Sequence, residues 1–149
     1  MMRILRNGEF FSMGDDLGII ADVGGEDVSL YSFHPADYRE KKLKEVREAC
    51  ERELNAIKAS YPESEVQSWY KQEIEAREYI SNPQANIPLI TRLANTRNIA
   101  IPDLASRIIQ KADAYTEAMG ILLGKRQALE DALWAATDWK DMAPINWDA

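Results

Sequence analysis

The chain has 149 residues, the length of one domain with its own hydrophobic core. Its composition is 46% hydrophobic and 29% charged, as in ordinary globular proteins, and its net charge of −7 argues against nonspecific binding to nucleic acid or anionic lipid. One Cys and one His exclude an intramolecular disulfide framework, a Cys-based zinc cluster and paired-imidazole chemistry. No apolar run reaches the length of a membrane span, so we expect a cytoplasmic protein that is not secreted.

Residues 1–35 predict a small antiparallel β meander. Their β-forming residues cluster at Ile4–Leu5, Phe10–Phe11, Ile19–Ile20 and Val28–Phe33. Asn7-Gly8 between two apolar pairs is typical of a tight hairpin turn, because both turn residues must adopt positive φ. From Glu9 to Asp27 there are six acidic residues and no basic one. Because so small a sheet is not stable alone, it must pack on the rest of the chain.

Residues 36–137 predict a helical domain of long, antiparallel, amphipathic helices. The first helix has one apolar stripe, made of Leu43, Val46, Cys50, Leu54, Ile57 and Tyr61. Prolines then mark the boundaries: a second helix ends at Ser81, a short third begins at Pro88, and the fourth runs from Pro102 to about Ala136. The sequence therefore predicts a mainly α fold with a small N-terminal sheet.

Residues 138–149 form a short Trp-rich tail, in which Pro144 argues against a regular helix. Three of the four Trp lie between Trp134 and the end of the chain. Two interpretations remain open. These side chains either pack on the helices or serve as anchors for a partner.

Two glycines, Gly120 and Gly124, precede Lys125 in the fourth helix. They lack the spacing and the Ser or Thr of a phosphate-binding loop, so they predict close packing against another helix, and Gly124→Leu should destabilise the fold. The acidic residues between Glu9 and Asp27 lack the pattern of a calcium loop. His34 and Cys50 have no catalytic partner in the sequence pattern. We therefore predict no enzyme activity, no metal and no cofactor.

Residues 89–108 have the outline of a helix-turn-helix, with a local surplus of basic residues. A recognition helix presents polar side chains in its first turns, whereas this one begins Pro102-Asp103-Leu104-Ala105. A helical corner within a structural domain is the favoured interpretation, and nucleic acid is not expected as a partner.

The helical residues resemble the tail-fibre assembly proteins of tailed phages. The resemblance covers roughly residues 38–140 and is carried by residues 68–79 (SWYKQEIEAREY), 88–99, 104–112 and 124–131 (GKRQALED). It implies a non-enzymatic chaperone that binds a phage tail-fibre protein, at the fibre's C-terminal tip, and assists its folding or trimerisation in the host cytoplasm. Residues 1–33 lie outside the resemblance.

Three hypotheses for the function follow. In the first, a chaperone masks apolar surface of a fibre through its N-terminal strands or its C-terminal aromatics, and the residues that would bind the partner are Phe10, Phe11, Tyr31, Trp139 and Trp147. In the second, the chain is a permanent structural connector in the virion tail. In the third, suggested by the net charge alone, it is an acidic inhibitor that mimics nucleic acid. Self-association is compatible with all three.

Overall fold

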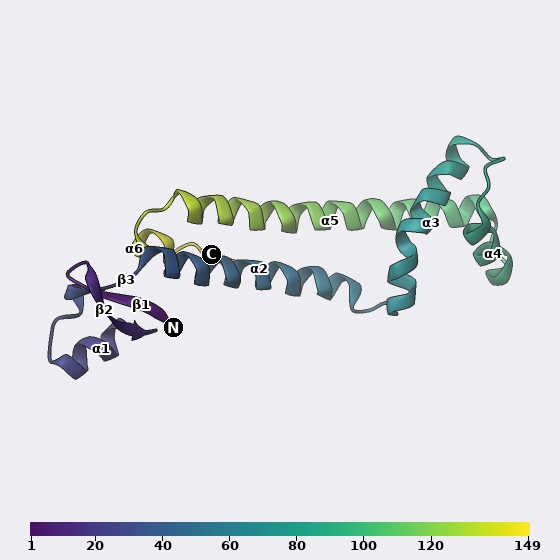
Figure 1. Cartoon of the computed structure of the whole chain (residues 1–149). Coiled ribbons are helices and arrows are strands. Elements are labelled where there is room, and N and C mark those ends of the chain that lie inside the picture. The colour runs from purple at the N-terminus through teal and green to yellow at the C-terminus, as the bar shows by residue number, and fades with distance from the viewer. The chain divides into compact units, whose positions relative to one another are not determined.

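The computed structural model describes residues 1–149 and contains three strands followed by mainly helices, which confirms the predicted fold class (Figure 1). The elements in chain order are β1 (Met2–Arg6), β2 (Glu9–Gly14), α1 (Leu17–Gly24), the 3-10 helix η1 (Val28–Leu30), β3 (Tyr31–Phe33), α2 (Pro35–Lys58), α3 (Glu63–Ser81), α4 (Pro88–Arg97), α5 (Ile101–Ala135) and α6 (Trp139–Met142). Helices α2 to α5 begin and end within a few residues of the predicted positions, since proline residues mark several of their ends.

The chain forms two compact units. The first consists of Met1–Arg52 together with Leu123–Ala149, and the second of Glu53–Leu122. The predicted β segment 1–35 and the predicted tail 138–149 therefore both lie in the first unit. None of the helices combines the length and the apolarity that a membrane span requires.

The N-terminal sheet is antiparallel, with β1 in the centre and the order β2-β1-β3. Asn7 and Gly8 have φ of 51° and 84°, as expected for the turn between β1 and β2. The third strand pairs with β1 and not with β2, so β2 is an edge strand. The register between β1 and β2 shifts after Ile4, where Phe11 is one extra residue in β2.

The prediction of a strand at Ile19–Ile20 is wrong, because these residues lie in α1. Local capping explains the difference. The Asp16 carboxylate accepts hydrogen bonds from the N–H groups of Gly18 and Ile19 at 2.8 and 3.1 Å, and Gly25 ends the helix with φ of 64°. The strand predicted over Val28–Phe33 is likewise shorter, since the Asp27 side chain caps η1 and pairing begins only at Tyr31.

In the first unit, the start of α2 is fixed to the end of α5 by basic side chains. Arg39 donates hydrogen bonds to the carbonyl oxygens of Leu133 and Ala136 at 3.0 and 2.7 Å, which satisfies acceptors that the end of α5 would otherwise leave unpaired. Arg47 forms an ion pair with Glu130 at 2.9 Å. The buried apolar side chains of these segments include Leu43, Val46, Cys50 and Leu133.

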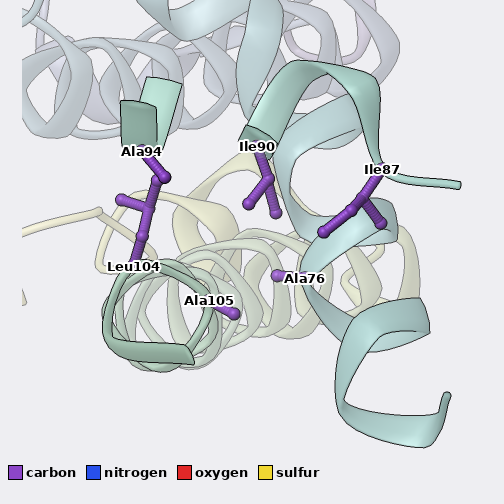
Figure 2. Packing of buried hydrophobic residues seen from close by; sticks show 6 residues of the cluster. All are labelled: Ala76, Ile87, Ile90, Ala94, Leu104 and Ala105. Carbon is purple, nitrogen blue, oxygen red and sulfur yellow. The ribbon is translucent and has the colours of Figure 1, made fainter. Parts of the chain in front are cut away.

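In the second unit, α3, α4 and α5 enclose a small apolar cluster. Figure 2 shows its side chains converging from the three helices and from Ile87, which directly precedes α4: Ala76, Ile87, Ile90, Ala94, Leu104 and Ala105. A carboxylate lies beside it. Glu75 is fully buried, and its Oε2 accepts a hydrogen bond at 2.9 Å from the N–H of Ile90 in the first turn of α4, where no residue of α4 itself provides a cap.

The predicted close packing at Gly120 and Gly124 is wrong. Both glycines are exposed, and a Cβ built on either would meet no atom within 4 Å. The apolar stripe of α5 lies on other positions, such as Leu104 and Leu133, so the glycines occur on the solvent side. Gly124→Leu is therefore not expected to overpack the structure.

Candidate partner-binding surface

The five aromatic residues predicted to bind a partner differ widely in exposure. Phe10 and Phe11 are 65% and 50% exposed, whereas Tyr31 and Trp147 are only 4% and 6% exposed. Trp139 is half-buried. The structure thus separates the five residues into an exposed pair on β2 and three that pack within the first unit.

Trp139 belongs to an aromatic cluster. Its ring lies edge-on to those of Phe33 and Tyr38, at centroid distances of 5.2 and 5.6 Å. The prediction that Pro144 excludes regular structure from the tail is wrong over residues 139–142, because Asp138 caps the short helix α6 before the proline is reached. Met142 of α6 is completely buried.

Two lysines hold Trp147 and the residues just before it in place. The Lys125 ammonium lies 4.3 Å from the centroid of its ring. Beside it, Lys42 of α2 is 4% exposed and donates hydrogen bonds to the Asn146 side chain and the Ala143 carbonyl. Burial lowers the pKa of Lys42. The tail is therefore part of the core of the first unit, and the interpretation of its tryptophans as exposed anchors is corrected.

The Tyr31 side chain is fixed through its hydroxyl group. Its hydroxyl donates a hydrogen bond to Glu26 at 2.7 Å, and Arg6 donates two more to the same carboxylate at 2.6 and 2.8 Å. The hydrogen bonds from Arg6, followed by that from Tyr31, lower the pKa of Glu26 to about 2. Phe11 contacts the Tyr31 ring edge-on at 5.3 Å, so Phe11 is an exposed residue that is nonetheless oriented by the sheet.

The two faces of the sheet differ in what they bury. Residues paired directly across strands share a face, so Met2 and Ile4 lie on one face and Leu5, Phe10 and Met13 on the other. Met2 and Ile4 are 4% and 0% exposed, whereas Phe10 and Met13 are 65% and 44% exposed. On the edge strand, the second face therefore exposes Phe10 and Met13, the latter opposite Arg3 of β1. Phe11 is also exposed, but its ring contacts Tyr31, which lies on the first face. We call the three exposed apolar residues Phe10, Phe11 and Met13 the β2 patch.

Three further exposed apolar residues follow the β2 patch in the chain: Ile19 and Val23 of α1, and Val28. The sequence prediction missed them because it placed Ile19 in a strand. Two more exposed residues, Ile121 and Trp134 on α5, are 65% and 61% exposed. The guanidinium of Arg39 lies 5.1 Å from the Trp134 ring, a contact that sequence spacing could not indicate.

The acidic residues near β2 are mostly committed to local roles. Asp16 and Asp27 cap helices, Glu26 pairs with Arg6, and Asp15 lies 3.6 Å from the N-terminal amino group. No group of three or more His, Cys, Asp or Glu side chains is placed to hold a metal ion. Residues 1–33 nevertheless carry six acidic and two basic side chains, so the surroundings of the β2 patch are negative.

Residues 110–147 match the protein family described as the HI1402 helical domain. They comprise the later part of α5, α6 and the segment that ends at Trp147. Among curated proteins, the chain is similar to one from Haemophilus influenzae that is described as an uncharacterized protein, with 33% identity over 45 residues. The aligned region is 30% of this chain and 66% of the relative, just under two thirds of its length. No solved structure matches the chain.

Proposed function

We propose that this chain is a non-enzymatic assembly chaperone for a phage tail-fibre protein. It binds the unassembled fibre at its C-terminal tip through the β2 patch and keeps the apolar surface there covered until the fibre folds or trimerises. It acts in the host cytoplasm during assembly and uses no cofactor, nucleic acid or membrane.

The observation that carries this proposal is the exposed apolar edge strand. Phe10, Phe11 and Met13 lie on a six-residue strand that has a neighbour on one side only. Soluble proteins usually protect such edges with charge, proline or a covering element, because an open apolar edge pairs with other chains. A protein that recruits extended segments of a β-rich partner uses this arrangement. The helical resemblance described above adds the identity of that partner.

Co-expression with the fibre protein encoded nearest to this gene tests the proposal. We expect the chain to increase the yield of soluble fibre trimer and to be absent from the purified trimer. Phe10→Lys with Met13→Lys should abolish the increase, because two charges on the open face block apolar contact and strand pairing. A control is Ile80→Lys with Ile121→Lys, which places two charges on exposed apolar residues outside the β2 patch.

The co-expression test distinguishes a chaperone from a permanent component of the tail. A fibre yield that does not depend on the chain would contradict the chaperone proposal. Stable retention of the chain on finished particles would instead support the alternative of a permanent tail connector.

A further inference from the structure

We propose that β2 binds its partner by strand addition, through the outward backbone groups of Phe10 and Met13, and that the added strand is an extended segment carrying basic and apolar residues. This inference deepens the proposed function and rests on it only in taking the partner to be a protein chain. It specifies which atoms of the β2 patch make the contact and what sequence chemistry they select.

The direction of the backbone groups follows from the hydrogen bonds of β1. The N–H of Arg3 donates to Asp37 at 2.8 Å, and its carbonyl accepts from His34 at 2.8 Å, so the Arg3 backbone faces away from β2. The N–H of Asn7 likewise donates to Leu30, beyond β3, at 2.9 Å. The N–H and C=O groups of successive residues point to opposite sides of a strand. Those of Leu5, which lies two residues from both Arg3 and Asn7, therefore also point toward β3, with which Leu5 is paired.

The consequence for β2 is specific. Met13 is the partner of Arg3, and Phe10 is the partner of Leu5. The N–H and C=O groups of Arg3 and Leu5 point toward β3, so they form no hydrogen bonds with Met13 and Phe10. The N–H and C=O groups of Phe10 and Met13 therefore point outward from the sheet. The same two residues carry exposed side chains on the open face. Backbone donors, backbone acceptors and apolar side chains thus coincide along one edge.

Charge selects the strand that can occupy this edge. Glu9 lies directly before Phe10, while Asp15 and Asp16 follow the end of β2. On the neighbouring strand β1, Arg6 lies opposite Glu9 and Arg3 opposite Met13, but these two side chains are paired with Glu26 and Asp37. Asp15 is 3.6 Å from the N-terminal amino group, and its side chain is 64% exposed. An incoming strand with Lys or Arg at alternate positions gains cross-strand attraction at both ends of β2, and its apolar residues cover Phe10 and Met13.

The same charges disfavour a second copy of this chain as the occupant. Antiparallel pairing of two β2 strands would bring Glu9 of one copy close to Asp15 of the other. Like charges placed opposite each other across strands are destabilising. The edge therefore discriminates against self-pairing while it remains open to a basic strand.

The test is fluorescence anisotropy of the full chain with labelled peptides. The probes are an alternating Lys-Val peptide, an alternating Glu-Val peptide, and the Lys-Val peptide with alternate backbone nitrogens methylated. We expect the first to bind and the other two to bind at least about tenfold more weakly, since they lose charge attraction or backbone hydrogen bonds. Met13→Pro removes one outward N–H without touching the β1 ladder, and Met13→Thr is its matched control, which keeps the N–H.

The outcomes distinguish strand addition from other contacts. The inference would be overturned if the methylated peptide or the Glu-Val peptide bound as tightly as the Lys-Val peptide. It would also be overturned if sedimentation showed a dimer of the chain that Met13→Pro disrupts. The methylated peptide decides the matter even if Met13→Pro does not fold. Fibre yield that rises on co-expression without any peptide binding overturns strand addition alone, whereas peptide binding without an effect on the fibre overturns the chaperone function alone.

Discussion

Glu75 offers the sharpest test of how the second unit is stabilised. Its side chain is fully buried, with Oε2 at 2.9 Å from the Ile90 N–H and Oε1 at 3.4 Å from the Lys71 ammonium. In Glu75→Ala, the buried Ile90 N–H loses its acceptor, and α4 loses the negative charge at its N-terminus. An orphaned buried donor costs about 1–3 kcal/mol. The Lys71 ion pair adds little, because the lysine is 59% exposed.

We therefore expect the free energy of unfolding to fall by about 1–3 kcal/mol in Glu75→Ala and by roughly 1 kcal/mol or less in Glu75→Gln, which keeps an acceptor but not the charge. Chemical denaturation followed by circular dichroism measures the loss, and amide exchange locates it at the Ile90 N–H. Glu73→Gln, on the same helix but paired at the surface with Arg77, is the control and should change stability by less than about 0.5 kcal/mol. Unchanged stability together with unchanged exchange at Ile90 would refute the capping role.

The remaining predictions concern α5, the sheet and the tail. Gly120→Ala and Gly124→Ala should each stabilise the protein by up to about 1 kcal/mol, because both positions are open and helical glycine is unfavourable; a lower melting temperature would mean that something packs there. The hydrogen bonds from Arg6 and Tyr31 lower the pKa of Glu26 from its ordinary value of 4.5 to about 2, so the stability that Glu26 contributes is present above pH 4.5 and is lost as the pH falls toward 2; Glu26→Gln should flatten an acid titration of stability over that range. Deletion of residues 138–149 removes Met142 and Trp147 from the core and should unfold the first unit, as judged by near-ultraviolet circular dichroism; a native-like spectrum would restore the interpretation of an independent tail.

The long helices could be predicted because their signals are local. Apolar spacing and prolines such as Pro88 determine where each helix begins and which side is buried. The Asn7-Gly8 turn is local in the same sense. At Ile19 two local signals conflict: its β propensity favours a strand, whereas the Asp16 cap three residues earlier begins a helix, and the helix forms.

The sequence pattern could not predict which residues from distant segments contact each other. Lys42 lies on a helix rich in charged residues, and nothing local indicates that it is buried against Asn146, 104 residues later. Glu75 meets Ile90 only because α4 folds back onto α3, and the open space around Gly124 depends on which elements lie near it in the fold. For the same reason, the sequence identified Phe10 and Phe11 as candidates but could not separate them from Tyr31 and Trp147, whose burial is tertiary.

The most direct test of the central claim is the yield of soluble fibre trimer when the fibre protein is co-expressed with this chain or with its Phe10→Lys, Met13→Lys variant. The variant must first be shown to be folded by circular dichroism. We expect the unmodified chain to raise the yield and the folded variant to leave it unchanged. An equal yield with both proteins would contradict the assignment of partner binding to the β2 patch.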